Sequence, residues 1–260
     1  MSSLKRENSD HIVVLEKAFR LLQMFSHDVP TMSISEAARR ADVTRPSARR
    51  ILLTCVNQGL METDGKDFWL TPKIMRLGYG YLSTLPYWES AQRHMRHLAD
   101  AVGESCSLAT LDGNEIVYLT RISERRGTIP LGVGSRLPVH ATSLGKALIS
   151  FAEPDVLASF VETAPFEKLT PDTITTAADF QKEVDKIRTA GYAMADGERE
   201  IGIRSIAVPV RTRSGRVVAA LNISANSLRV SKETMLAEYL PQLSITAKEI
   251  STDLGYTTLH

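Results

Sequence analysis

A pair of short amphipathic segments, separated by a two-residue turn, constrains the fold of this chain more than any other feature. Ser33 is a candidate N-cap for the first segment, and Glu36 follows three residues later, which predicts a capping box. Asp42-Val43 makes the turn. Thr44 is a candidate cap for the second segment, where Pro46 lies in the first helical turn and its missing N–H costs nothing. The pattern predicts two helices joined by a tight turn.

The flanking residues complete this unit. Between His11 and Phe25 apolar residues recur at steps of three and four, which predicts a core helix. After Gly59, a stretch with apolar ends carries Asp64-Gly65 at its middle, which is the mark of a small β-hairpin. We therefore expect a winged helix-turn-helix over residues 1–70.

Basic residues gather in the same region. Residues 1–85 hold 12 Lys+Arg and 9 Asp+Glu, a charge of +3, and the remaining 19 and 21 give −2. On charge alone, a solvated helix face explains the arginines equally well. On a helix-turn-helix, however, polar and basic side chains reach phosphates and base edges. The predicted nucleic-acid contacts are Arg39, Arg40, Thr44, Arg45, Ser47, Arg49, Arg50 and, in the wing, Lys66.

The rest of the chain predicts a linker helix and a second domain. Residues 71–85 have one apolar face and end at Pro86, and we expect them to link the first domain to a domain over 86–260. Helices mixed with antiparallel strands give this domain an α+β fold. We expect helices at 87–102, 143–151, 155–161, 177–190 and 232–254, and strands at 105–110, 115–122, 206–210 and 217–224.

Composition excludes several classes of protein. With 43% hydrophobic and 23% charged residues, the chain has the composition of a water-soluble globular protein. Cys55 and Cys106 are too few for a disulfide framework or a four-cysteine metal site. The polar N-terminus lacks a secretory signal, and no apolar run approaches the ~20 residues that span a bilayer. We expect a cytoplasmic protein that does not enter membranes.

Two motifs in the segment 140–148 suggest enzymes and are incomplete. Gly145-Lys146 resembles part of a P-loop, but His140 stands where the first glycine is needed and Ala147 where the Mg²⁺-binding hydroxyl is needed. Ser143 and Lys146 match the S-x-x-K pattern of acyl-transfer enzymes, yet its partner motifs are missing from the sequence. We expect no catalytic site here.

Cofactor and metal motifs are equally incomplete. Gly132-Val-Gly134 lacks the third glycine of a dinucleotide fingerprint. His94 and His97 share a helix face without the further ligands that a metal site needs, so surface or dimer contacts explain them better. We expect neither cofactor nor metal.

Polar residues in this part of the chain are compatible with an anion pocket. Ala141, Thr142 and Ser143 begin a helix, where free N–H groups and the helix dipole favour a carboxylate. From the residues alone, a simple N-cap with close helix packing is the favoured interpretation. The stretch 196–200 lies near a hairpin in which alternation places Asn222 and Ser224 on one face, beside Ser205.

With these motifs in place, the chain is similar to the IclR family of bacterial transcriptional regulators from Val14 to about Leu254. The resemblance implies a winged helix joined to a GAF-like effector domain, and dimers that often form tetramers. The implied partners are a double-stranded DNA operator with an inverted repeat, a small carboxylate effector and a second copy of the chain, and RNA polymerase is a further candidate. The segments that carry the resemblance are Ile34–Arg50, Leu137–Lys146, Gly202–Val210 and Ala219–Ser224.

The resemblance also implies a ligand site. Leu144 is larger than the residue of a glyoxylate-responding member, and Gly197 replaces the first residue of the family's acidic pair, so a bulkier carboxylate than a two-carbon acid is expected. Segments 103–108, 112–118 and 133–138 resemble the subgroup that controls aromatic-acid breakdown through protocatechuate and β-ketoadipate. The effector residues carried over from the family are Ser143, Leu144, Asp196, Ser205, Asn222 and Ser224.

Three alternatives remain open. In the first, the effector belongs to another carboxylate pathway, of the glyoxylate, pyruvate or sugar-acid type. In the second, the second domain is an enzyme that uses Ser143 with Lys146, although a complete catalytic constellation is missing. In the third, the winged helix serves protein contacts only, which salt-dependent DNA binding would exclude.

Overall fold

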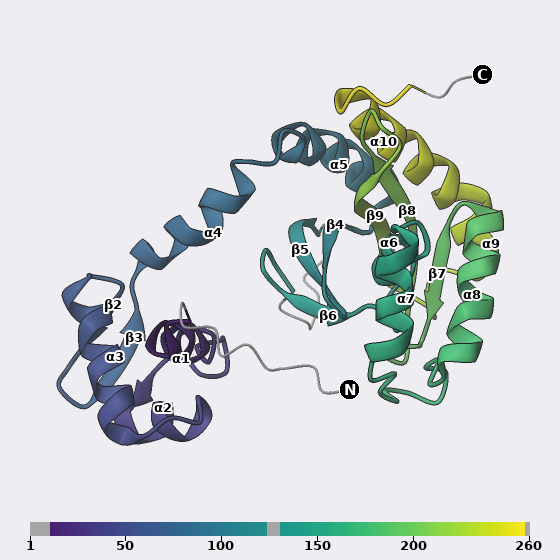
Figure 1. Cartoon of the computed structure of the whole chain (residues 1–260). Coiled ribbons are helices and arrows are strands. Elements are labelled where there is room, and N and C mark those ends of the chain that lie inside the picture. Colours follow the sequence, from purple (N-terminus) through teal and green to yellow (C-terminus); the bar gives the residue numbers. More distant parts are fainter. Residues whose placement is uncertain (1–10, 124–130, 258–260) are drawn as a thin grey trace. The chain divides into compact units, whose positions relative to one another are not determined.

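The computed structural model describes residues 11–123 and 131–257 of the chain. It divides into two compact units, residues 1–81 and 82–260, and each is described by itself (Figure 1). The division falls inside the predicted linker helix. This segment consists of a 3₁₀ turn, Pro72–Ile74, and helix α4, Met75–Leu82, which buries none of its residues. The domain limits 1–70, 71–85 and 86–260 stay a prediction.

The first unit is the expected winged helix-turn-helix. Ala48, Ile51, Leu52 and Cys55 form the buried stripe of α3 and pack against Ala37 and Ala38 of α2. The elements are α1 Val13–Leu22, β1 Met32–Ser33, α2 Ile34–Arg40, α3 Arg45–Asn57, β2 Met61–Thr63 and β3 Asp67–Leu70. The short strand β1 was not predicted; it pairs with β3 and makes the hairpin a three-stranded sheet.

Local caps explain where these helices begin. Thr44 Oγ1 accepts the Ser47 N–H at 3.4 Å, as predicted. Ser33 Oγ accepts the Glu36 N–H at 3.3 Å, but the Glu36 carboxylate turns to Arg39 and Arg40 instead of the Ser33 N–H. The predicted capping box is therefore only half formed, because two guanidinium groups on the next helical turn are stronger partners for a carboxylate than a backbone N–H.

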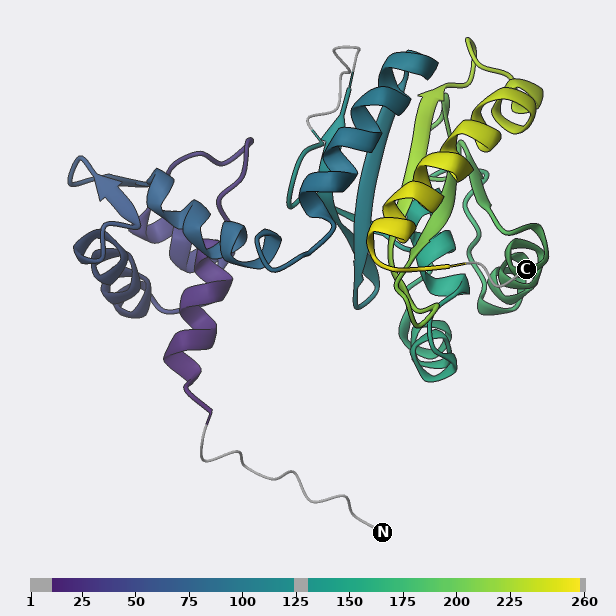
Figure 2. The same cartoon turned by 90° about the horizontal axis from the view of Figure 1, so that it is seen from above.

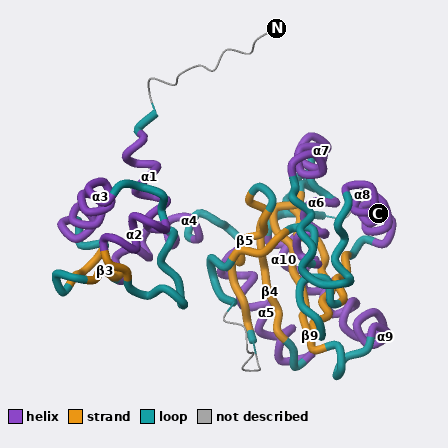
Figure 3. The backbone as a smooth tube through the Cα atoms, turned by 90° about the horizontal axis from the view of Figure 1, so that it is seen from below, coloured by secondary structure: helices purple, strands orange, loops and turns teal. Residues whose placement is uncertain are grey.

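The second unit is a six-stranded antiparallel sheet between two layers of helices. The strand order is β6-β5-β4-β9-β8-β7, shown as one orange sheet in Figure 3. The strands are β4 Ser105–Asp112, β5 Glu115–Ile122, β6 Arg136–Pro138, β7 Ala193–Asp196, β8 Ile203–Arg211 and β9 Val217–Asn226. The predicted α+β class is confirmed, and the strands that sequence reasoning missed, β6 and β7, are the short ones at the two edges.

The two faces of this sheet differ in the size of their side chains. One face carries large apolar residues and packs against α5, Trp88–Val102, and α10, Leu240–Asp253, which lie across it in Figure 2. The other face is lined near its centre by alanine, with Ala109, Ala193, Ala207 and Ala220 all buried. Helices α6 Ser143–Ser150, α7 Pro154–Thr163 and α8 Ala177–Ala190 cover this second face. Small side chains let α6 approach the sheet closely, and all eight of its residues are buried.

The predicted closing helix over 232–254 is present as one helical run over 232–253 that contains a π-helical turn. It consists of α9 Lys232–Thr234, the π-helical turn Met235–Tyr239, and α10. Pro241 stands at the start of α10, where it lacks the N–H that would continue the α-helical ladder. The helix was therefore predicted at the right place, and the π-helical turn was not expected.

Candidate functional site

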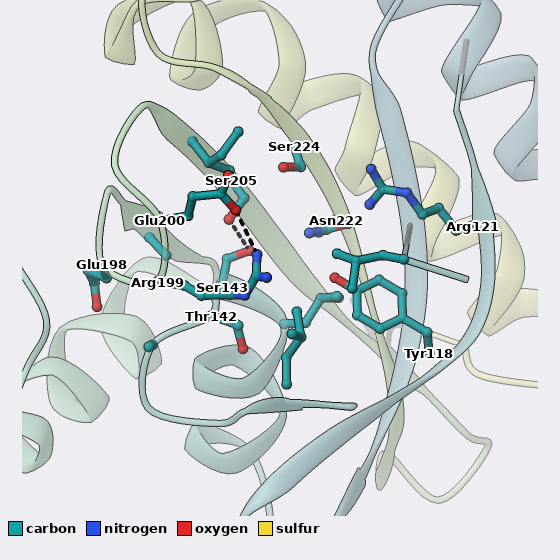
Figure 4. A pocket seen from close by; sticks show the side chains of 16 residues that line it. Tyr118, Arg121, Thr142, Ser143, Glu198, Arg199, Glu200, Ser205, Asn222 and Ser224 are labelled. Carbon is teal, nitrogen blue, oxygen red and sulfur yellow. Dashed lines mark hydrogen bonds and ion pairs between the residues drawn. The ribbon is translucent and has the colours of Figure 1, made fainter. Parts of the chain in front are cut away.

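A cavity of about 80 Å³ lies in the second unit, between the N-terminal end of α6, the sheet and the loop after β7. Figure 4 shows its walls. Tyr118, Arg121 and Asn222 occupy one side, and Ser143, Ser205, Arg199 and Glu200 lie on the other. The cavity is therefore surrounded largely by hydrogen-bonding groups. Its remaining lining residues are Leu131, Leu137, Ala141, Thr142, Leu144, Ala195, Glu198, Ile203 and Ser224.

A β-bulge brings two of the lining residues to the same face. On β4, Ser107 pairs with Arg121 and Ala109 pairs with Tyr118, so two steps along β4 correspond to three along β5. The extra residue reverses the alternation of β5 at Leu119. Tyr118 and Arg121 consequently both line the cavity, although their spacing in a regular strand would place them on opposite faces.

A hydrogen bond at the floor of the cavity fixes the orientation of the Asn222 side-chain amide. Asn222 Oδ1 accepts the backbone N–H of Ser107 at 3.1 Å. A backbone N–H requires an acceptor, so the side-chain nitrogen Nδ2 must be the atom that faces the cavity. Asn222 is buried, and among the described residues nothing accepts a hydrogen bond from Nδ2. The amide therefore presents two donors to the cavity.

The N-terminal end of α6 closes the opposite wall. Thr142 Oγ1 caps the helix by accepting the Gly145 N–H at 3.1 Å, and the Ser143 hydroxyl donates to Ser205 Oγ at 2.8 Å. A Cβ at Gly145 would lie 2.4 Å from the Cα and the carbonyl oxygen of Val139, so only glycine permits this approach. The interpretation of this segment as an N-cap is confirmed, and the cap also lines the cavity.

A buried ionic cluster lies behind the loop after β7. Lys146 is fully buried, and its Nζ donates to Glu198 Oε1 at 2.6 Å and to Glu183 Oε1 at 3.2 Å. Burial raises the pKa of Glu198, and the Lys146 ammonium opposes that shift. The second oxygen of Glu198 is buried without a described partner. Since Lys146 is held by two carboxylates, the proposed pairing with Ser143 in an S-x-x-K enzyme has no support.

The charged residues of the cavity wall are two arginines, Arg121 and Arg199, and two glutamates, Glu198 and Glu200. Arg199 pairs with Glu200 at 3.2 Å. Burial raises the pKa of Tyr118, and Arg121 and Arg199 both act to lower it, so the phenol lies within the field of two guanidinium groups. Arg121 makes no ion pair with any residue in the described ranges.

The structure brings together most of the predicted effector residues. Ser143, Leu144, Ser205, Asn222 and Ser224 all line the cavity. Asp196 does not line it, because its carboxylate bonds to Arg204 Nη2 at 2.7 Å and the side chain is 44% exposed. The assignment of Asp196 to the effector site stays a prediction.

Sequence reasoning missed the cavity residues contributed by β5 and by the loop after β7. Tyr118 and Arg121 reach the cavity through the bulge, for which the sequence has no signal. Arg199 and Glu200 lie in the polar stretch 196–200, which the sequence indicated as a whole without indicating these two residues. The fold around this stretch decides which of its side chains faces inward.

The first unit carries the predicted nucleic-acid contacts on α2, α3 and the wing. Thr44, Arg45, Arg49, Arg50 and Lys66 are exposed. Ser47 is half-buried and, with Arg50, lines a groove between α1 and α3. Arg39 and Arg40 are exposed too, but both bond to the Glu36 carboxylate. Their positive charge is therefore partly neutralised in the isolated chain.

Within residues 11–123 and 131–257, no group of three or more His, Cys, Asp or Glu side chains could hold a metal ion. His94 lies between Glu249 and Asp253, at 3.1 Å from each. None of the described helices is both long and apolar enough to cross a bilayer.

A winged helix-turn-helix followed by a domain with a polar cavity defines a ligand-responsive DNA-binding regulator. The model of the IclR helix-turn-helix domain matches residues 14–65, and the model of the bacterial transcriptional regulator IclR C-terminal domain matches residues 79–252. The chain belongs to the IclR family of transcriptional regulators.

The chain is similar to two regulators of aromatic-acid metabolism along most of their length. It is 33% identical to the p-hydroxybenzoate hydroxylase transcriptional activator of Acinetobacter baylyi, over 96% of this chain and 94% of the activator. It is 31% identical to the Pca regulon regulatory protein of Pseudomonas putida, over 93% of this chain and 84% of that protein.

Solved structures show the same fold. A transcriptional regulator from Rhodococcus sp. RHA1 is 38% identical and superposes with a TM-score of 0.83, over 94% of this chain and 99% of that one. An IclR homolog from Microbacterium hydrocarbonoxydans, solved in complex with 4-hydroxybenzoate, is 28% identical with a TM-score of 0.81, over 93% of this chain and 99% of that one.

Proposed function

We propose that this regulator responds to a hydroxylated aromatic carboxylate, bound in the cavity beneath α6. The observation that carries the proposal is the locked amide of Asn222, which presents hydrogen-bond donors to a cavity also lined by Arg121, a cation without an ion pair among the described residues. Donors beside such a guanidinium group favour an anion. The relatives named for p-hydroxybenzoate and Pca regulation, and the homolog solved with 4-hydroxybenzoate, support an aromatic acid or its ring-cleavage product.

The size of the cavity bears on how the ligand enters. Its volume of about 80 Å³ is well below the roughly 300–1,000 Å³ of typical ligand pockets. We propose that the cavity widens when an aromatic acid binds, by movement of the loop 197–202 away from the sheet. The ion pair between Arg199 and Glu200 lies within this loop, so it does not hold the loop to the sheet.

Ligand binding acts on DNA only through a difference between two states. A ligand that binds two arrangements of the protein equally shifts nothing. We propose that the effector favours one arrangement of a dimer or tetramer on its operator. A dimer is supported by the exposed apolar residues of the first unit, Ile12, Leu15 and Phe19, which are at least 50% exposed, because such patches mark interfaces.

The DNA contacts follow from α3 and the wing. Exposed Thr44, Arg45 and Arg49, with Ser47, are proposed to face the major groove, where arginine reads guanine in a bidentate contact. Arg39, Arg40, Arg50 and Lys66 are proposed to bind phosphates, and binding is expected to weaken steeply with salt. A two-fold dimer requires an inverted-repeat operator.

The regulator is proposed to work in the cytoplasm, and contact with RNA polymerase is part of the proposal.

The domain is proposed to bind its acid without converting it. Of the two groups that an S-x-x-K enzyme would use, the Ser143 hydroxyl donates to Ser205 and Lys146 bonds to two carboxylates. Incubation of the full chain with the acids, followed by chromatography, should return them unchanged. Turnover that is lost in Ser143→Ala would establish an enzyme instead.

Calorimetric titration of the full chain tests the ligand class. We expect 4-hydroxybenzoate or protocatechuate to bind with a single site, and β-ketoadipate is the ring-cleavage alternative. Saturable binding of pyruvate or a sugar acid, without binding of any aromatic acid, would favour the other carboxylate pathways and contradict the proposal.

A further inference from the structure

Among the described residues, Arg121 is the cavity-lining cation without an ion pair. The cations around it each pair with a carboxylate, since Arg199 pairs with Glu200, Lys146 with Glu198 and Glu183, and Arg204 with Asp196. The side-chain hydrogen bond that Arg121 makes to a described residue is long, at 3.4 Å to Ser107 Oγ. A half-buried guanidinium group that lacks an anion among these residues carries a desolvation cost that a bound carboxylate would remove.

Ser107 places Arg121 and Asn222 side by side. Its hydroxyl accepts from the Arg121 guanidinium, and its backbone N–H donates to Asn222 Oδ1. In Figure 4, Arg121 extends toward Asn222, and the Tyr118 side chain lies below the two. Guanidinium and amide N–H groups are therefore supplied to one corner of the cavity by β5 and β9, the two strands that flank β4.

The opposite wall has a different chemistry. Ser143 and Ser205 bond to each other, and Glu200 forms an ion pair with Arg199, so this wall offers acceptors as well as donors and its two charges offset each other. A carboxylate would find no net positive charge there, whereas a hydroxyl group would find acceptors. Charge therefore orients a hydroxy acid with its carboxylate toward β5.

We propose that Arg121, aided by the Asn222 amide, binds the carboxylate of the effector and so determines the selectivity of the site for acids. This inference rests on the proposed function and deepens it. Arg121 is absent from the effector residues that the family resemblance carried over. Ser107 acts as a positioning residue, since it bonds to both groups.

A thermodynamic cycle between protein and ligand tests the proposal. The affinities of 4-hydroxybenzoate and the neutral 4-hydroxybenzamide are measured by calorimetry on the full chain, on Arg121→Gln and on the control Arg213→Gln. Because a charged hydrogen bond is lost only for the acid, the preference for acid over amide should fall about 10- to 100-fold in Arg121→Gln. In Arg213→Gln it should stay within about threefold, because Arg213 is exposed and lies outside the cavity lining.

The outcomes separate the two proposals. Thermal unfolding checks that each variant is folded, and Arg121→Lys, which keeps the charge without the bidentate geometry, should retain part of the preference. An unchanged acid preference in Arg121→Gln overturns the role of Arg121. If the wild-type chain binds neither aromatic compound, the aromatic class fails, and the same cycle with pyruvate and its amide decides on Arg121. Absence of binding to every acid overturns both proposals.

Discussion

Ser143 at the N-terminus of α6 donates a hydrogen bond to Ser205 on β8 over 2.8 Å, joining residues 62 positions apart in the chain. The bond ties the covering helix to the sheet at the wall of the cavity. A ligand that inserts its own polar group between the two serines replaces this bond. The position of α6 relative to the sheet is therefore expected to depend on the occupancy of the cavity.

Replacement of Asn222 by aspartate should remove the effector response. The carboxylate keeps an acceptor for the Ser107 N–H, but it turns the donor that faces the cavity into an anion. We expect effector affinity to fall at least about tenfold, because two like charges then share a small site. Calorimetry measures the loss, and operator binding without effector should be unchanged.

The contrasting variant is Asp196→Ala. Its carboxylate bonds to Arg204 on the neighbouring strand and lies outside the cavity lining, so effector affinity should change by less than about threefold. A loss as large as that of Asn222→Asp would place Asp196 in the ligand site.

Gly145→Ala should destabilise the second unit. The added Cβ would lie 2.4 Å from backbone atoms of Val139, which cannot move without displacing the loop before α6. Overpacking of this kind costs about 1–3 kcal/mol. In Gly78→Ala, the matched control on exposed α4, the Cβ meets nothing within 4 Å, and about 0.5–1 kcal/mol of stabilisation is expected. Denaturant unfolding of both variants, followed by circular dichroism, compares the two; equal stability would mean that the approach at Gly145 is not tight.

Lys146→Met should strongly destabilise the second unit, because it leaves Glu198 and Glu183 without their shared cation. Breaking a buried pair in this way costs about 3–5 kcal/mol. If Lys146→Met unfolded with the same free energy as the wild type, water would already stabilise both carboxylates.

The same cluster predicts a pH dependence. Burial raises the pKa of Glu198 above its ordinary 4.5, so in the range just above 4.5 the folded chain binds more protons than the unfolded chain. The contribution of Glu198 to stability is complete below 4.5 and is lost as the pH rises through the folded pKa. The difference in unfolding free energy between wild type and Glu198→Gln should therefore shift against the wild type with rising pH. If the unfolding free energy of the wild type instead rose relative to that of Glu198→Gln with rising pH, the pKa of Glu198 would be lowered in the folded chain.

Two substitutions in the first unit should separate sequence reading from phosphate binding. Arg45 is exposed at the start of α3, and Arg45→Ala should reduce the preference for operator over random DNA by roughly 1–3 kcal/mol. Lys66 is exposed in the wing, and Lys66→Ala should weaken binding to both DNAs alike and reduce the salt slope by about one. Equal losses of specificity in the two variants would contradict the assignment of roles.

Regular elements with strong local signals were predictable from the sequence. Thr44 caps α3 as expected, and α8 occupies the predicted residues 177–190. The short edge strands β6 and β7 were missed, because three or four residues of pairing leave little pattern. The closing helix was predicted, but the π-helical turn that precedes Pro241 was not.

The candidate site was predictable only in part, and through resemblance more than through pattern. Asn222 and Ser224 share a sheet face by simple alternation, and both line the cavity. Arg121 reaches the cavity because of a bulge, which depends on the pairing of β5 with β4 and leaves no trace in the sequence. Asp196 lies outside the cavity lining and pairs with Arg204, a contact that forms only in the folded sheet and that the sequence does not indicate.

The coupling of the cavity to operator binding is the central claim, and fluorescence anisotropy tests it most directly. The full chain is titrated onto its own upstream intergenic DNA at fixed salt, with and without saturating 4-hydroxybenzoate, protocatechuate or β-ketoadipate, and the titration is repeated with Asn222→Asp. The account predicts that the wild type prefers this DNA over random DNA, that one acid changes its affinity about 5- to 150-fold, and that the variant binds the DNA equally well without responding. An operator affinity that no acid alters, or a response that survives in Asn222→Asp, would contradict the account.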